Sequence, residues 1–522
     1  MRMTEKDLLL AIDNGTQSLK AMVFDITGNL VDREQIPLSP YFAKQPGWAE
    51  QDPDLFWKTL CQACQRIMTG SSVESSRIAA VSVTTQRGTV INVDKTGAPL
   101  RPAILWLDQR RCQELPPLGG WWNLLFKITG LKKTVTTLQR QAEANWIIQN
   151  QPEIWKKTHK YLLLSGYLNF RLTGEYSDSI GSQVGYLPFD YKRHQWARPS
   201  SWKWGCVPVE PDQLPKLVAP GQLLGTVTQQ ASKETGLPKD LPVFAAAADK
   251  ACEVVGSGGM DPSIGCLSFG TTATININHH RYIEPIRLVP AYPSAIPGHF
   301  TLEVQVFRGF WMVNWFKHEF GYKEQQAAKK TDTTTEALFE KMIADIPPGS
   351  MGLMLQPYWT PGIRKPGPEA KGAIIGFSDV HTRAHLYRSI LEGLAYALRE
   401  GKERIEHRSR IPITRLRVSG GGSQSDQALQ ITADIFGLPV ERPHLYDTSG
   451  LGAAIDCAVG AGLHCNFQTA IAGMTRAGEE FEPNLANHHR YNMLYREVYR
   501  KMYRRMKPLY RKIREMKWIP EK

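Results

Sequence analysis

The pattern of hydrophobic and polar positions predicts two strand–turn–strand units about 255 residues apart. An apolar run at residues 8–13 ends in Asp13, a Gly-Thr turn follows, and residues 18–25 form a second apolar run. The same order returns at residues 264–269, Gly270-Thr271-Thr272 and residues 273–278. Short apolar runs bounded by turn residues are typical of buried strands. The chain is therefore predicted to hold two similar α/β halves, divided near residues 250–260.

Helical periodicity predicts the elements between and after these units. Residues 53–69 and 382–405 carry apolar side chains at helical spacing. A short strand at residues 416–418 leads into a glycine loop, and a helix at residues 425–436 follows. Gly437 and Pro439 come directly after that helix, which is a typical stop signal.

Composition limits the class of protein. The 522 residues are 42% hydrophobic, which indicates a large globular chain of two to four domains. No apolar run is long enough to span a membrane, and the first residues contain no signal-peptide pattern. Eight cysteines are too few for a disulfide scaffold. Cys61 and Cys64 have metal-like spacing, but they fall in a predicted amphipathic helix and are interpreted as buried thiols rather than a zinc site. We expect a cytoplasmic protein.

The basic charge is concentrated at the end of the chain. Residues 490–522 carry +9 of the total +13, so the pI says little about the main body. Tyrosines recur there at every fourth position, at Tyr491, Tyr495, Tyr499 and Tyr503. One interpretation is a site for nucleic acid or an anionic membrane. The favoured interpretation is a surface helix at residues 486–522 that packs its tyrosines on the second half, with neither nucleic acid nor membrane as a partner.

The first Gly-Thr turn has the residues of a phosphate site. Gly15 lets the backbone approach a ligand, and turn N–H groups form a concavity for phosphate oxygens. Thr16 and Ser18 add hydroxyls, Lys20 adds a charge, and Asp13 is suited to hold Mg²⁺ directly or through water. An ordinary hairpin turn is the alternative, because the motif is weak when it stands alone.

The motif is repeated, which changes the interpretation. Phe269-Gly270-Thr271-Thr272 supplies a second turn, and Gly420-Gly421-Gly422-Ser423 supplies a loop suited to a base or ribose. Two phosphate turns and one nucleoside loop, in two halves, indicate an ATP clamp across a cleft. Neither a P-loop nor a Rossmann fingerprint occurs in the sequence.

Transfer of a phosphoryl group to a hydroxyl needs a base, and Asp249 is the candidate. It ends the apolar run of residues 243–248. A carboxylate at that position can accept the hydroxyl proton during in-line transfer. The alternative is that Asp249 only caps the following helix.

Taken in order, these motifs resemble the FGGY family of carbohydrate kinases, within the actin/Hsp70/hexokinase-like ATPase superfamily. The resemblance runs from Leu8 to about Gly462. Its first-half motifs are residues 13–20, 47–53, Thr85-Gln86-Arg87, 102–110 and 172–175 with Asp178. In the second half, residues 372–392 resemble the family's C-terminal signature and residues 418–443 its adenosine segment.

The resemblance implies two ribonuclease-H-like domains of the actin-like ATPase type with a cleft between them. Their expected ranges are residues 1–254 and 255–485. It implies ATP-dependent phosphorylation of a small polyol or open-chain sugar, with Mg²⁺, and Asp249 as catalytic base. The positions matched to ATP contacts are Thr16, Gln17, Ser18, Lys20, Gly270, Thr271, Thr272, Asn314, Gly421, Gly422, Ser423 and Ser425. The positions matched to the sugar pocket are Gln86, Arg87, Trp106, Asp249 and Lys250, and Asp13 matches the Mg²⁺-associated position.

Departures from the family pattern bear on the substrate. Glycerol kinases have Glu after their pocket Arg, but in this chain Arg87 is followed by Gly88. The position of their pocket Tyr is occupied here by Leu138, and the position of a Lys in the family signature is occupied by Glu143. Losing two hydroxyl partners disfavours glycerol, and Gly88 leaves room for a larger molecule. A four- to six-carbon polyol or ketose, such as a pentulose, is preferred, with glycerol kinase as the alternative. Lys250 is interpreted either as a substrate contact or as a salt-bridge partner at the rim.

A hypothesis of another class is a non-catalytic, actin-like ATP-binding module. It would need the nucleotide turns but no acceptor pocket, so the joint presence of Gln86, Arg87, Trp106 and Asp249 argues against it. A homodimer is compatible with the sequence.

Overall fold

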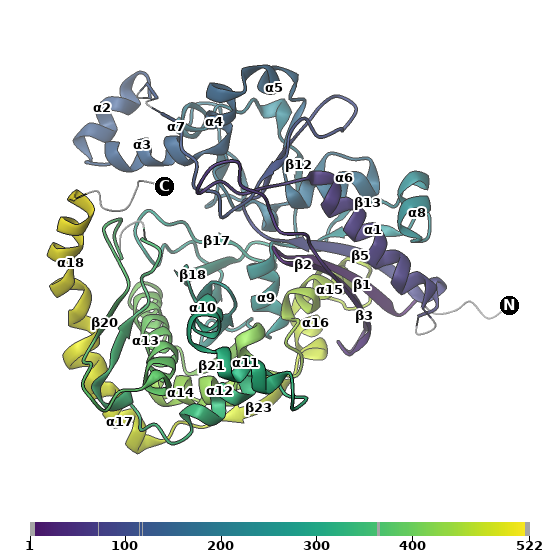
Figure 1. The fold of residues 1–522 in the computed structure, drawn as a ribbon. Helices are drawn as coiled ribbons and strands as arrows, with labels where there is room; N and C mark the ends of the chain where they lie inside the picture. Colours follow the sequence, from purple (N-terminus) through teal and green to yellow (C-terminus); the bar gives the residue numbers. More distant parts are fainter. Residues whose placement is uncertain (1–5, 71–72, 114, 117, 363–365, 517–522) are drawn as a thin grey trace.

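The computed structural model describes residues 6–70, 73–113, 115–116, 118–362 and 366–516. It consists of two α/β halves that lie against each other, the first purple to teal and the second green to yellow (Figure 1). Two such α/β halves are what the repeated turns predict.

The first half is built on a six-stranded sheet of order β13-β14-β5-β1-β2-β3. Strand β1 pairs antiparallel with β2 and parallel with β5, and β5 pairs parallel with β14. The strands are β1 (Leu8–Asn14), β2 (Ser18–Asp25), β3 (Leu30–Pro37), β5 (Ile78–Thr85), β13 (Leu223–Thr226) and β14 (Pro242–Ala245). The amphipathic helix α1 (Pro53–Thr69) covers β2 and β3 with its apolar side, on which Cys61 and Cys64 are buried.

The second half repeats this topology in a seven-stranded sheet of order β17-β18-β16-β15-β21-β22-β23. The antiparallel strands β15, β16 and β18 correspond to β1, β2 and β3, and the parallel strands β21 and β22 correspond to β5 and β14. The strands are β15 (Ile264–Phe269), β16 (Ala273–His279), β17 (Tyr292–Pro293), β18 (Phe300–Val306), β21 (Arg415–Ser419), β22 (Val440–Pro443) and β23 (Ala477–Phe481). The predicted duplication is confirmed.

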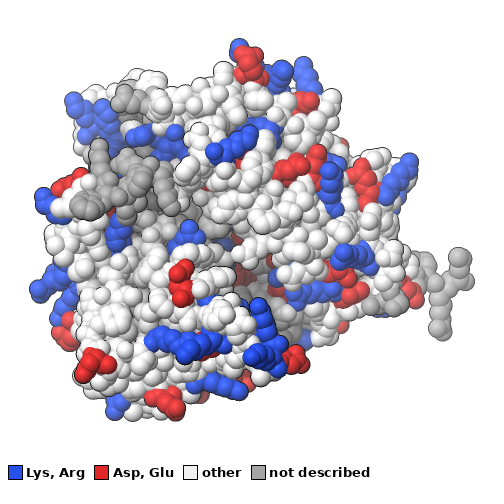
Figure 2. Space-filling model, in the orientation of Figure 1, with Lys and Arg blue, Asp and Glu red and all other residues white. Residues whose placement is uncertain are grey.

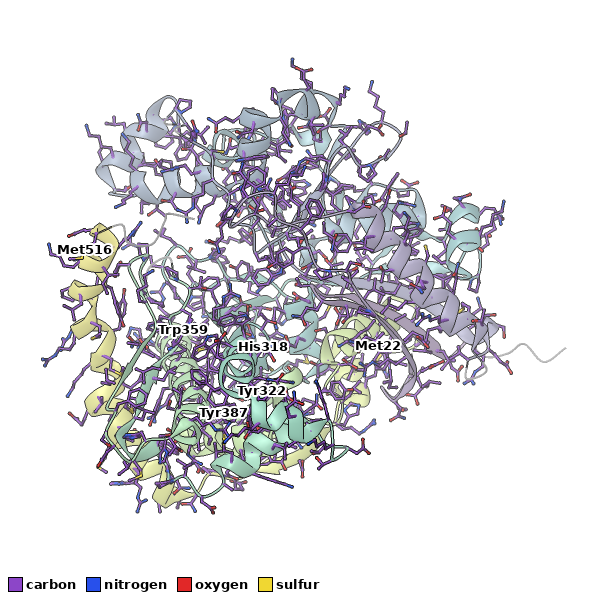
Figure 3. The ribbon with its side chains drawn as sticks, viewed as in Figure 1. Met22, His318, Tyr322, Trp359, Tyr387 and Met516 are labelled. Atoms are coloured by element: carbon purple, nitrogen blue, oxygen red, sulfur yellow. The ribbon has the colours of Figure 1, made fainter. Side chains whose placement is uncertain are left out.

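One face of the second sheet is covered by a helical layer. The long helix α13 (Arg383–Ser409) packs against β16, β18 and α14 (Asp426–Phe436). The helices α10 (Trp311–Phe320) and α12 (Thr335–Ile343) enclose Tyr387 of α13 in an aromatic cluster (Figure 3). The predicted helices at residues 382–405 and 425–436 are thus present, the first of them extended by one turn.

Two helices lie between the sheets and join the halves. The helix α9 (Asp249–Gly256) packs against α15 (Thr448–Gly460), where a Cβ on Gly452 would overlap the backbone of Cys252. In turn α15 lies on β1 and β5, and a Cβ on Gly450 would overlap the side chain of Met22 of β2, which is labelled in Figure 3. A helix late in the chain therefore completes the core of the first half.

A smaller, tryptophan-rich layer extends the first half, at the top of Figure 1. Its four-stranded sheet has the order β4-β7-β6-β8, and helices cover it. Its strands and helices are β4 (Glu50–Gln51), β6 (Val90–Val93), β7 (Ala103–Ile104), β8 (Lys160–Leu163), α2 (Trp121–Ile128), α3 (Lys132–Gln141), α4 (Glu143–Asn150), α5 (Pro152–Lys157) and α7 (Trp202–Cys206). The helix α6 (Leu164–Thr173) connects this layer to the first sheet.

The C-terminal tyrosines are buried against the second half. The segment runs through α17 (Leu485–Leu494), one π-helical turn (Tyr495–Tyr499) and α18 (Arg500–Glu515). Tyr495 and Tyr499 pack on Tyr396 of α13, and the Tyr491 hydroxyl donates to Glu392 at 2.8 Å. The expectation of a docked surface helix is confirmed for the described part; residues 517–522 lie outside it. Among the described helices, none combines the length and apolar character needed to cross a membrane.

Candidate active site

The first Gly-Thr turn connects β1 to β2. It is closed by a hydrogen bond from the Gly15 N–H to the Ser18 carbonyl at 3.1 Å. Asp13 is the second-last residue of β1 and lies opposite Lys20 in the register of the hairpin, while Gln17 is exposed at the tip. Burial raises the pKa of Asp13 to about 7, against the opposing effect of Lys20. Within the described part of the chain, no side chain donates a hydrogen bond to the Asp13 carboxylate.

Lys20 reaches across to the second half. Its Nζ lies 2.6 Å from Oδ1 of Asp447, the residue that precedes α15. Arg33 of β3 approaches the same carboxylate, with Nη1 at 3.1 Å from Oδ2. The side chain of Asp447 is 1% exposed, so this ion pair lies in the interface between the halves. Sequence reasoning placed Lys20 near phosphates and did not identify Asp447.

The second Gly-Thr turn connects β15 to β16. The N–H groups of Gly309 and Phe310 donate to the carbonyls of Thr271 and Gly270, at 2.9 and 3.0 Å. Phe310 also stacks on Phe269 at 4.3 Å, so the segment before α10 holds the turn in place. The Thr272 hydroxyl is bonded to the Phe307 carbonyl at 3.4 Å.

The glycine loop follows β21 and leads through a 3-10 turn (Gly421–Gln424) into α14. Gly420 has a φ of 84° and lies against the backbone of Phe269, and a Cβ on Gly422 would overlap the Phe310 ring. At Gly421, by contrast, an added Cβ would meet no atom within 4 Å. The loop therefore abuts the second turn on one side and is open at Gly421.

Three further predicted ATP positions have different surroundings. The Ser423 hydroxyl donates to the Gly420 carbonyl at 2.7 Å and closes the loop internally. Ser425 is the N-cap of α14, with its hydroxyl accepting from the Ala428 N–H at 3.1 Å. Asn314 is exposed on α10. The two serines thus shape the loop, and Gly421 with the neighbouring backbone forms its open surface.

Asp249 is the first residue of α9 and lies between the two halves. Its Oδ1 accepts from the Lys250 N–H at 2.8 Å and lies 3.9 Å from Nε of Arg87. The side chain is 25% exposed, and no described residue donates a hydrogen bond to its second oxygen. Burial raises the pKa of Asp249 above its ordinary value, although Lys250 and Arg87 oppose the shift. One carboxylate oxygen thus accepts from the N–H of the next residue, and the other is open to a ligand.

Lys250 forms an ion pair, as one of its two interpretations expects, and its side chain is only 17% exposed. Its Nζ lies 2.6 Å from both Glu253 Oε2 and Ser268 Oγ, and 3.9 Å from the Cβ position of Gly270. The other Glu253 oxygen accepts from the Ser419 hydroxyl at 2.7 Å. The ammonium therefore points at the second turn, through a buried network that sequence reasoning missed.

The predicted sugar-pocket residues of the first half are joined by hydrogen bonds. Thr16 donates to Gln86 Oε1 at 2.7 Å, and the Trp106 indole N–H donates to Thr16 Oγ1 at 3.0 Å. Trp106 is 37% exposed, so its ring forms an accessible wall. Thr16, predicted as a phosphate contact, thus connects the first turn to the pocket.

Arg87 is the central cation of this pocket. Its Nη2 donates to Glu303 Oε1 at 3.0 Å, and its guanidinium lies 5.2 Å from the ring centre of Tyr292. Gly88 has a φ of 66°, so the backbone itself favours glycine at this position. Arg87 thus lies between Asp249 and a carboxylate of the second half. The surface in Figure 2 is hollowed between the two halves.

The sequence around Asn276 and Glu303, which sequence reasoning did not identify, indicates their burial only weakly. Strands β16 and β18 alternate, with Ile275, Ile277, Leu302 and Val304 in the core and polar residues between them. The polar positions Asn276 and Glu303 are nonetheless buried. Alternation of apolar and polar residues alone predicts that the polar face of these strands is exposed to solvent. The tertiary structure shows that the other half packs against this face and buries it.

Comparison with known proteins bears on the same regions. The model of the FGGY family of carbohydrate kinases, N-terminal domain, matches residues 8–256, and that of the C-terminal domain matches residues 265–461. An uncharacterised sugar kinase of Escherichia coli (strain K12) is 30% identical over 496 residues, covering 94% of this chain and 92% of its own. A xylulose kinase of Staphylococcus epidermidis is 28% identical over 507 residues, covering 94% and 95%. The crystal structure of a ligand-bound xylulose kinase from Lactobacillus acidophilus has a TM-score of 0.81 at 20% identity, covering 97% of this chain and 99% of that one.

Proposed function

This chain belongs to the FGGY family of carbohydrate kinases and is an ATP-dependent phosphotransferase, and we propose that its acceptor is a four- to six-carbon polyol or ketose, such as a pentulose. The observation that carries the proposal is the position of Asp249. It has one open carboxylate oxygen, lies beside Arg87, and stands at the start of the helix between the two glycine turns. A base, an acceptor-side cation and two phosphate turns thus converge at one junction.

Asp249 is assigned as the general base. The acceptor hydroxyl oxygen forms a bond to the γ-phosphorus, the bond from that phosphorus to the ADP oxygen breaks, and Asp249 takes the hydroxyl proton. A carboxylate whose pKa is raised by burial is a stronger base than an exposed one. Arg87, at 3.9 Å, helps to keep Asp249 ionised before the transfer.

The nucleotide is assigned to the two turns and the glycine loop. The open surface at Gly421 suits a flat base or ribose, and the backbone N–H groups of the turns suit phosphate oxygens. Lys250, held by Glu253 and Ser268 next to Gly270, places a positive charge where phosphate charge would lie. We therefore propose that Lys250 contacts a phosphate group as well as the sugar.

The residues around Asp13 fit a bound Mg²⁺. The carboxylate lacks hydrogen-bond donors among the described residues and has a raised pKa, and a cation would favour its charged form. Mg²⁺ is usually held by one or two carboxylates together with phosphates and waters. When bound, it would neutralise charge on the transferring phosphoryl group.

The acceptor pocket is assigned to Gln86, Arg87, Trp106 and Asp249. Position 88 has no side chain, because it is Gly88, and position 138 is Leu138 rather than a tyrosine. Both features favour an acceptor larger than glycerol. The Staphylococcus epidermidis relative is a xylulose kinase, and this similarity supports a pentulose.

The test is coupled ADP release with Mg-ATP against three- to six-carbon polyols, ketoses, aldoses and sugar acids. We expect one strong acceptor among the four- to six-carbon polyols and ketoses, and loss of its turnover in Asp249→Asn. Highest kcat/KM for glycerol would overturn the acceptor class. ATP binding without transfer to any acceptor would instead support a non-catalytic module.

A further inference from the structure

Glu303 brings a carboxylate from the second half into the acceptor pocket of the first. It lies on β18, and its Oε1 accepts from Arg87 Nη2 at 3.0 Å. The same guanidinium lies 3.9 Å from Asp249 through Nε. Arg87 is thus placed between two carboxylates, the assigned base and Glu303, which come from different elements.

The second oxygen of Glu303 is buried and has no partner. Within the described part of the chain, Oε2 makes no hydrogen bond, although the side chain is only 3% exposed. Asn276, opposite Glu303 in the register of β16 and β18, likewise has an unpaired buried Oδ1. Buried acceptors without a donor are costly and uncommon in native structures. Two adjacent acceptors on one strand pair therefore indicate a ligand that supplies donors, such as hydroxyl groups.

The residue after Arg87 explains why a carboxylate from the other half can serve as a hydrogen-bond acceptor in the pocket. Gly88 carries no side chain, so the residue that follows Arg87 contributes no carboxylate to the pocket wall. Glu303 supplies one from the opposite side, and Tyr292 fills the space beside the guanidinium. A substrate molecule that contacts both walls of the pocket has to reach from Asp249 to β18.

We propose that Glu303 is a specificity-determining residue, whose Oε2 accepts a hydrogen bond from an acceptor hydroxyl distant from the one that is phosphorylated. This rests on the proposed function. The contact requires an acceptor that carries hydroxyls beyond the reacting end, and it couples acceptor binding to the approach of the two halves. Asn276 is the neighbouring acceptor for the same part of the molecule.

The test compares Glu303→Gln with Glu369→Gln. Glu369 is a matched control because it is 7% exposed and pairs with Lys507 of α18 at 3.2 Å, outside the residues assigned to the site. With the best acceptor of the panel, we expect Glu303→Gln to raise the acceptor KM about 10- to 100-fold, as for loss of a hydrogen bond to a charged group. The KM for ATP should change less than about twofold. Glu303→Asp, which keeps the charge, should restore part of the affinity, and Glu369→Gln should alter neither KM.

A deoxy series separates this contact from a structural role. Each hydroxyl of the best acceptor is removed in turn, and kcat/KM is measured for the wild type and Glu303→Gln. One analogue should lose activity with the wild type and lose no more with the variant, because the two changes remove the same contact. Additive losses for every analogue, or a lower unfolding midpoint with an unchanged acceptor KM, would overturn the inference while leaving the kinase function intact. Absence of acceptor-dependent ADP release from the wild type would overturn the proposed function and this inference with it.

Discussion

Lys20 and Asp447 form an ion pair of 2.6 Å that joins the first hairpin to the start of α15, 427 positions later in the chain. Asp447 is almost fully buried, whereas Lys20 and Arg33, its two cationic neighbours, are each 24% exposed. The carboxylate thus neutralises two cations at the junction of the halves. Its position next to the first turn links the interface to the site.

We expect Asp447→Asn to lower the free energy of unfolding by about 1–3 kcal/mol, because it leaves two partly buried cations without their carboxylate. Chemical denaturation measures this directly. Lys20→Met combined with Asp447→Asn should cost less than the sum of the single changes, since both remove the same pair. A fully additive double variant would show that the pair contributes nothing to joining the halves.

Asp249→Asn should reduce kcat by about 100-fold or more, because the amide cannot take the hydroxyl proton. ATP affinity, measured by equilibrium binding, should stay within about twofold of the wild type. In the wild type, kcat should fall on the acidic side at a higher pH than an ordinary aspartate would give, because the raised pKa leaves the base protonated there. Unchanged turnover in the variant would remove Asp249 from the chemistry.

Gly421→Ala and Gly422→Ala form a matched pair that tests the nucleotide loop. A methyl group at Gly421 meets no protein atom within 4 Å, so the unfolding midpoint should not change. The same methyl would occupy the assigned nucleotide space, and we expect the KM for ATP to rise about tenfold. Gly422→Ala should instead lower stability, because its Cβ overlaps the Phe310 ring. Unaltered ATP binding in Gly421→Ala would place the nucleoside elsewhere.

Asp456 should make stability depend on pH. It is buried in α15, where its Oδ2 accepts from the Ala247 N–H at 3.3 Å, and its Oδ1 has no partner among the described residues. Burial raises the pKa of Asp456 well above its ordinary value. The neutral form is therefore favoured in the folded state, and stability is highest below the ordinary aspartate pKa and falls as pH rises through the raised one.

The measurement is the free energy of unfolding of the wild type and Asp456→Asn from pH 4 to 8. The difference should grow in favour of the variant toward pH 8, because asparagine cannot ionise. A difference that stays constant across this range would show that Asp456 does not change its protonation in this window on folding.

Local chemistry made much of this protein predictable from sequence. The hairpins around Gly15 and Gly270, the helix stop at Gly437 and the helical spacing of Tyr491, Tyr495 and Tyr499 depend on interactions within a few residues. Strand and helix periods are properties of the backbone, so their repetition was sufficient to predict the duplication and the two phosphate turns. The local pattern also made Asp249 and the glycine loop candidates, and the resemblance to a family added the sugar-pocket positions Gln86, Arg87 and Trp106.

The tertiary structure determined which charged side chains pair with one another. Asp447, Glu253 and Glu303 lie far from Lys20, Ser419 and Arg87 along the chain, and only the packing of one half on the other brings them together. Long-range contacts depend on how whole sheets and helices pack, which hydrophobic periodicity does not specify. The sequence by itself thus determined the fold type and the class of chemistry. Tertiary packing determined that Lys250 faces the second turn and that Arg87 pairs with a carboxylate from the opposite half.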